Sequence, residues 1–202
     1  MVETVHGTIV ECNTAYPGER NTTDAHRRTM IKHGWSKLFD VDILDAEGPD
    51  LELPIPNGKR IQKNLVGKDI KNYDSMLVLS HFKGHPMGGF GGALKQLSIG
   101  CASSAGKANI HGAGKPEEMW TTEQNAFLES MADAAESVVK LFDGKIVYIN
   151  VMKNMSVDCD CCAVAEDPCM KDIGILASLD PIAIDQACLD LVYASDDPGR
   201  DH

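Results

Sequence analysis

Apolar runs and helical patterns alternate along the 202 residues of the chain. Three runs have the composition of buried strands, at residues 76–81 (MLVLSH), 145–151 (KIVYINV) and 173–177. Shorter strands are expected at residues 8–12, 40–44 and 51–55, with a Gly-Pro turn between the last two. Because strands alternate with helices, the sequence predicts an α/β fold with a mixed, partly parallel sheet flanked by helices.

The strongest helical pattern covers residues 122–142. Apolar side chains recur there on one helical face, which we expect to point into the core: Phe127, Met131, Ala134, Val138 and Phe142. Further helices are expected at residues 24–33, 92–99 and 181–193. The rest of the glycine-rich segment at residues 84–106 is expected to be loop.

Several of these helices carry end signals. Thr121 and Gln124 fit a capping box before the longest helix. Gly34 is placed to end the first helix, and Asp180 to cap the last one. Asp185, close to the start of that last helix, is explained by its attraction to the helix dipole.

The composition fits one folded α/β domain over residues 1–202, since 43% of the residues are hydrophobic and 24% charged. A net charge of −11 argues against general binding to nucleic acids or anionic membranes. No stretch approaches the roughly 18 consecutive apolar residues of a membrane helix. With no signal-peptide pattern at the start, a cytoplasmic location is expected. The seven cysteines are then not a disulfide framework.

The first candidate site follows the strand at residues 76–81, since sites in α/β sheets lie beyond the carboxyl ends of strands. Paired histidines there could ligate a metal or transfer protons, so the catalytic candidates are His81, His85 and Lys95. Glycines let a backbone approach a ligand, and a helix starting near Gly91 would attract an anion. The cofactor-binding candidates are Lys83, Gly89, Gly91, Gly92 and Lys107. The alternative is a glycine-rich structural loop.

Known phosphate motifs do not match this segment. A P-loop needs four residues between its first glycine and the Gly-Lys pair, whereas five separate Gly100 from Gly106. Ala108 also stands where a Ser or Thr would hold magnesium. His111, a little further on, is interpreted as a surface histidine, with membership of this first candidate site as the alternative.

The second candidate site is the cysteine cluster of residues 154–169, with the spacing Cys-x-Cys-Cys-x6-Cys. Thiolates suit iron–sulfur clusters, zinc and copper(I). Adjacent Cys161 and Cys162 cannot both point inward from a regular strand, so two or three ligands are expected. The metal-ligand candidates are Cys159, Cys161 and Cys162, with Asp158 or Asp160 able to add an oxygen. The alternative is a loop with incidental or redox-active thiols.

Three of these segments carry a family resemblance: SHFKGHPMGGFGGALKQLSIGCASSAGK, DCDCC and DIGILASLDPIAIDQACLDLV. They resemble the bacterial and archaeal domain of unknown function, family 362, whose members are commonly called uncharacterised iron–sulfur center proteins. Many members carry a ferredoxin-like module with two four-cysteine motifs after the segment matching residues 106–115. This chain has only HGAGKPEEMW there and is therefore expected to be a member that lacks the inserted module.

The resemblance implies metal or iron–sulfur binding, with oxidoreductase as the leading class. Any cluster would have to use the cysteines of residues 159–169, and a separate ferredoxin is a candidate partner. Family members have more chain before the segment matching Thr8. Elements missing there would leave a sheet edge that a second copy could cover, giving a homodimer. The histidine, lysine and glycine pattern is also similar, over a short stretch, to the nickel-dependent lactate racemase family, which has related loops around its cofactor.

Three functional hypotheses follow, the third being a scaffold or electron-transfer partner that serves the ferredoxin module of longer members. In the first, a cytoplasmic protein holds an iron–sulfur cluster or a single Zn, Fe or Ni ion at the cysteine cluster, next to the pocket of histidines, lysines and glycines. In the second, a metal-free domain binds a small phosphate- or carboxylate-bearing molecule at the glycine-rich segment. The sequence leaves open whether the protein is an enzyme.

Overall fold

The centre of the fold is a mixed three-stranded sheet. The computed structural model describes residues 7–162 and 164–201. Within them β5 (Met76–His81), β8 (Ile146–Met152) and β9 (Gly174–Ser178) lie in the order β5-β8-β9. β5 pairs in parallel with β8, and β8 pairs antiparallel with β9. The predicted mixed α/β class is confirmed.

The other described strands form three two-stranded sheets of their own. β1 (Ile9–Glu11) pairs in parallel with β2 (Val41–Ile43). β3 (Leu51–Pro54) pairs antiparallel with β4 (Lys63–Val66), and β6 (Lys83–His85) with β7 (Gly89–Gly91). β4, β6 and β7 were not predicted, because lysine, asparagine and glycine make up most of their sequences (KNLV, KGH and GFG), and these residues are depleted in strands.

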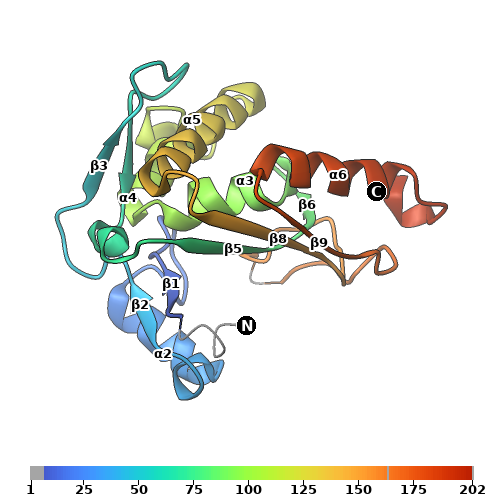
Figure 1. The fold of residues 1–202 in the computed structure, drawn as a ribbon, viewed down its shortest axis with the longest axis horizontal. Helices are drawn as coiled ribbons and strands as arrows, with labels where there is room; N and C mark the ends of the chain where they lie inside the picture. Colours follow the sequence, from blue (N-terminus) through green and yellow to red (C-terminus); the bar gives the residue numbers. More distant parts are fainter. Residues whose placement is uncertain (1–6, 163, 202) are drawn as a thin grey trace.

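Five α-helices complete the described fold: α2 (Thr23–Lys32), α3 (Ala93–Lys95), α4 (Ser104–His111), α5 (Gln124–Phe142) and α6 (Pro181–Tyr193). α3 continues into a π-helical turn, Gln96–Gly100. α3, α5 and α6 lie along one face of the central sheet (Figure 1). α4 was not predicted, and its first three residues belong to the glycine-rich segment 84–106, which was expected to be loop there. In the part of the chain that the structure describes, no helix has the length and apolarity needed to cross a membrane.

The predicted apolar stripe of α5 is buried, as expected. The predicted capping box at its start is wrong. Glu123 is the N-cap, and its carboxylate accepts a hydrogen bond from the Ala126 N–H at 3.0 Å. The helix therefore begins later than the Thr121 and Gln124 pattern requires. Glutamate is not among the preferred N-cap residues, so this cap could not be recognised from the sequence.

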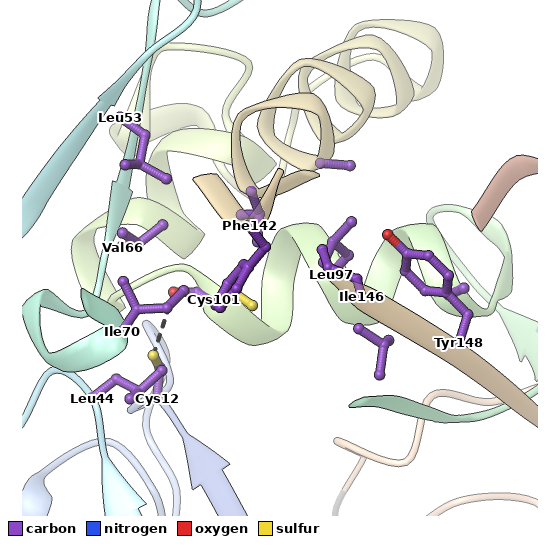
Figure 2. Close-up of a cluster of buried hydrophobic side chains, with 14 of the residues drawn as sticks. Cys12, Leu44, Leu53, Val66, Ile70, Leu97, Cys101, Phe142, Ile146 and Tyr148 are labelled. Carbon is purple, nitrogen blue, oxygen red and sulfur yellow. Dashed lines mark hydrogen bonds between the residues drawn. The ribbon is translucent and has the colours of Figure 1, made fainter. Parts of the chain in front are cut away.

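The main core lies between the central sheet and its helices. Leu97, Phe142, Ile146 and Tyr148 meet there, and all four are almost fully buried (Figure 2). The same cluster reaches Cys12, whose thiol faces the carbonyl oxygen of Cys101 at 3.5 Å. The β1–β2 pair is thereby joined to the rest of the fold.

A single buried carboxylate links α6, β8 and α3. Asp185 is 2% exposed and accepts hydrogen bonds from the N–H groups of Ala93 (2.7 Å) and Leu94 (2.9 Å). It also accepts one from the Asn150 amide at 2.8 Å. At Gly92 a side chain would collide with this carboxylate. Asp185 therefore caps α3, which corrects the expectation that it acts on the dipole of its own helix.

We expect Asp185→Ala to lower the free energy of unfolding by about 2–4 kcal/mol, because three donors lose a buried acceptor. Burial raises the pKa of Asp185, so the folded protein keeps this proton to higher pH than the unfolded chain. The free energy of unfolding of the wild type should therefore fall as the pH rises from near 3.8 through the raised pKa. The difference in free energy of unfolding between wild type and Asp185→Ala should become smaller over the same range. Urea unfolding at several pH values measures both effects.

Asp190→Ala is the matched control on the same helix. Asp190 is exposed, and its side chain accepts a hydrogen bond from the Gln186 amide at 2.8 Å. We expect a change within about 0.5 kcal/mol. A loss as large as that of Asp185→Ala would mean that the capping of α3 is not what Asp185 contributes.

Candidate functional site

The two candidate segments of the sequence lie together, at one edge of the central sheet. β5 and β8 are parallel, so the chain leaves both strands at their shared carboxyl end. β6 follows β5, and the cysteine loop follows β8. The N–H of Gly84 donates to the Ser156 carbonyl oxygen at 2.8 Å. A side chain at residue 84 would collide with the backbone of Val157, so this glycine permits the close contact.

Cys159 and Cys161 form a pair of thiols at the centre of this region. Their sulfur atoms lie 2.8 Å apart, and both are free. Cys159 is only 4% exposed, whereas Cys161 is open to solvent. The Lys95 ammonium lies 3.9 Å from the Cys159 sulfur. The arrangement thus joins one shielded thiol, one accessible thiol and a cation.

The pair shares its protons unequally. The hydrogen bond from Cys159 lowers the pKa of Cys161 to about 6, helped by a hydrogen bond from Tyr16 and the charge of Lys95. The same contact, followed by burial, raises the pKa of Cys159. Burial and the Cys161 contact also raise the pKa of Tyr16. At neutral pH the site therefore holds a thiolate on Cys161, with a thiol and a phenol as donors to it.

His85 supports the pair from β6. It is 7% exposed, and its Nδ1 accepts the N–H groups of Met87 (3.2 Å) and Gly88 (2.9 Å). The ring is therefore neutral, with its proton on Nε2. A hydrogen bond from His85 lowers the pKa of Cys159, opposing the larger effects of Cys161 and burial. His85 thus acts as a donor to the buried sulfur.

His81 and Lys83 converge on Asp160, the residue between the two cysteines. His81 Nδ1 lies 3.1 Å from both Asp160 oxygens, and its Nε2 lies 2.7 Å from the Lys153 carbonyl oxygen. The Lys83 ammonium, on a 5% exposed side chain, lies 3.5 Å from Asp160. Both ring nitrogens of His81 face acceptors, so only the protonated ring can donate to both. These contacts hold the cysteine loop against the end of β5.

The predicted glycines shape the lysine positions. Gly89 is the first residue of β7, directly after the turn from β6, and its φ of 75° is a conformation that favours glycine. A Cβ at Gly91 would lie 3.2 Å from the Lys83 ammonium and 3.5 Å from Lys95 Cδ. The Lys83 ammonium and the Lys95 side chain therefore both lie against the backbone of Gly91. The sequence predicted that free N–H groups at the start of the next helix would attract a ligand anion. Those N–H groups, of Ala93 and Leu94, instead donate hydrogen bonds to the Asp185 carboxylate.

Lys107 and His111 lie on α4. The Lys107 ammonium is buried and donates a hydrogen bond to the Ala102 carbonyl oxygen at 2.6 Å. Burial lowers the pKa of Lys107, and the nearby Cys12, Asp45 and Glu11 partly offset this by raising it. The structure thus groups Lys107 with the β1–β2 region. His111 is 8% exposed, so the expectation of a surface histidine is wrong. Its Nδ1 donates to the Lys107 carbonyl oxygen at 2.7 Å, and its ring stacks on Phe127.

Cys162 and Cys169 do not complete a four-thiol cage around the pair. Cys162 is exposed in the turn after Cys159. The Cys169 sulfur faces the carbonyl oxygens of Met155 (3.6 Å) and Gly199 (4.0 Å). Over residues 7–162 and 164–201, no three His, Cys, Asp or Glu side chains are grouped closely enough to hold a metal ion. The donors present suit a site with two thiolates better than a four-cysteine cluster.

Tyr16 is the site residue that the sequence did not reveal. It lies in the loop after β1, and its ring packs against Trp120 with the centroids 5.7 Å apart. Its partner Cys161 is distant in the sequence, and nothing in the local pattern of residues 12–20 distinguishes it from a core or surface tyrosine.

This fold and site define a mixed α/β domain with a thiol pair beyond the carboxyl ends of two parallel strands. Residues 1–190 match the family described as Domain of unknown function (DUF362), and the chain belongs to that family. No curated protein matches the sequence.

One solved structure with a similar fold is the lactate racemase apoprotein from Thermoanaerobacterium thermosaccharolyticum, with a TM-score of 0.55 and 15% sequence identity. The similarity covers 94% of this chain and 41% of that protein, so this chain spans less than half its length. At this identity the likeness establishes the fold.

The lowered pKa of Cys161 predicts its reactivity. In metal-free Cys162→Ser protein, the rate of Cys161 alkylation by iodoacetamide should rise with pH through a midpoint near pH 6, because the thiolate is the nucleophile. Lys95→Met should move this midpoint upward, since the ammonium stabilises the thiolate. Peptide mass spectrometry resolves the labelled residue. Lys115→Met, which removes an exposed lysine paired with Glu118, is the control and should leave the midpoint unchanged.

Proposed function

We propose that the protein binds a single transition-metal ion, or the metal of a small cofactor, through the thiolates of Cys159 and Cys161. The observation that carries the proposal is the 2.8 Å approach of the two sulfur atoms beside the Lys95 ammonium. Two adjacent thiolates repel each other unless a cation or a shared proton lies between them. A soft metal ion is the cation that thiolates prefer.

The surrounding residues support this role. His85 and Lys95 stabilise negative charge on Cys159, and Tyr16 and Lys95 do so on Cys161. The exposed Cys162 is the candidate third ligand. Bound iron or nickel would supply redox or Lewis-acid chemistry, and zinc would supply Lewis-acid chemistry alone. Because the thiols must stay reduced to bind, we place the protein in a reducing compartment such as the cytoplasm.

Metal titration tests this function directly. Metal-free protein prepared under argon and titrated with Co²⁺ should develop thiolate-to-metal charge-transfer absorption. Cys159→Ser and Cys161→Ser should each weaken metal binding by about 100-fold or more, since losing a metal ligand costs more affinity than losing a residue that only hydrogen-bonds to a ligand. Cys169→Ser is the matched control and should bind normally. Normal binding by both ligand variants would contradict the proposal.

Elemental analysis of protein purified without oxygen and without a histidine tag identifies the metal. Iron with equimolar sulfide and a brown absorption band would indicate a cluster held with further ligands. Iron, nickel or zinc without sulfide would indicate a single ion. Protein that carries no metal and binds none on titration would overturn the proposal.

A second candidate function is the binding of a small carboxylate or phosphate beside the thiol pair. Lys83 and Lys95 flank Gly91 there, and Lys83 is almost fully buried with Asp160 as its charged partner. The solved protein with a similar fold is named a lactate racemase, and lactate is a small carboxylate. A ligand anion would replace or join Asp160 between these cations.

Calorimetry on metal-free protein tests this second candidate, with lactate and inorganic phosphate as the probes. Whichever of the two probes binds, Lys83→Met should weaken its binding by at least about tenfold, because one charged hydrogen bond to the anion is lost. Lys153→Met is the control: this exposed lysine pairs with Asp172 outside the pocket. Equal affinities of wild type and Lys83→Met for the probe would show that the anion does not bind beside Lys83.

A further inference from the structure

β9 forms one edge of the central sheet, and β5 forms the other. β8 lies on one side of β9, and among the described residues no strand pairs with its other side. Half of the strand's backbone N–H and C=O groups point to that open side. Figure 1 shows β9 beside β8, with α6 returning over the inner face of the sheet. This edge can therefore accept a further strand.

β9 also lacks the features that keep edge strands apart. Proteins protect such edges with lysines, prolines, bulges or inward-pointing charges. The strand sequence Gly-Ile-Leu-Ala-Ser contains none of these residues, and its pairing with β8 runs without interruption. Unprotected edges persist in native proteins when something covers them.

The side chains next to this edge are large and apolar. Ile175 is 64% exposed, and Leu179 and Ile182, where β9 turns into α6, are 77% and 67% exposed. Together they leave a few hundred Å² of apolar surface in water, a substantial part of the roughly 800 Å² per partner that a standard interface buries. The backbone of β9 and the adjoining face of α6 add to that area. Single scattered apolar residues would need no explanation, but these three adjoin an open backbone edge.

We propose that β9 pairs antiparallel with β9 of a second copy, giving a two-fold symmetric dimer with one continuous six-stranded sheet. A second copy fits because an edge strand pairs with itself antiparallel about a two-fold axis, which presents the same apolar residues from both sides. β9 contains no charged side chain, so pairing two β9 strands brings no like charges of these strands together even though each copy has a net charge of −11. This interface uses no residue of the thiol site and stands independently of the proposed function.

The mass of the intact protein in solution tests this dimer. Light scattering coupled to size exclusion, repeated over a range of concentrations, should give twice the chain mass of 21.9 kDa. The double variant Ile175→Lys, Leu179→Lys should be monomeric, because lysines on both copies would repel each other at the edge. Leu79→Lys is the matched control: Leu79 is 56% exposed on β5, the strand at the other edge of the sheet, and this variant should remain dimeric. Circular dichroism confirms that each variant folds.

Hydrogen exchange locates the contact. Outward-pointing amides of residues 175–178 should exchange slowly in the dimer and at least tenfold faster in the double variant. Wild-type protein that stays monomeric at the highest concentration would overturn the proposal and favour another occupant for the edge. A dimer that survives the double variant, or that Leu79→Lys dissociates, would overturn it by placing the interface elsewhere.

Discussion

The buried carboxylate of Asp185 is the interaction on which the site depends. α3 has only three residues before its π-helical turn, and a helix of that length is not stable alone. Asp185 holds its first N–H groups against α6 and β8, and so determines where Lys95 points. The chain thereby supplies its own anion where the glycine-rich sequence suggested a ligand. Lys95 is left to act on the cysteine pair instead.

Much of the fold could be predicted from the sequence, because its main elements have strong local patterns. The strand at residues 76–81 and the buried stripe of α5 were both predicted correctly from periodicity. The division into four small sheets could not be, since pairing between distant short strands leaves no local trace. β6 is an example: Lys-Gly-His has no strand pattern, and only its pairing with β7 makes it a strand.

The sequence predicted the residue types of the site better than their arrangement. The rule that sites lie beyond the carboxyl ends of strands pointed to the segment after β5, and the structure brings the cysteine loop after β8 against it at Gly84. The sequence could not say which cysteines meet. Cys159 and Cys161 point to one place, whereas Cys169 faces backbone carbonyls near the chain end. Tyr16 and the buried His111 depend on long-range packing that spacing does not encode.

The contact between Tyr16 and Trp120 has a consequence for how the site communicates with the surface. Tyr16 hydrogen-bonds the Cys161 sulfur, and its ring lies 5.7 Å from that of the exposed Trp120. A change in the charge on that sulfur alters the bond to Tyr16 and hence the surroundings of the indole. The protein therefore carries an intrinsic fluorophore that contacts a partner of Cys161, so the emission of Trp120 can report the state of that sulfur without an added label.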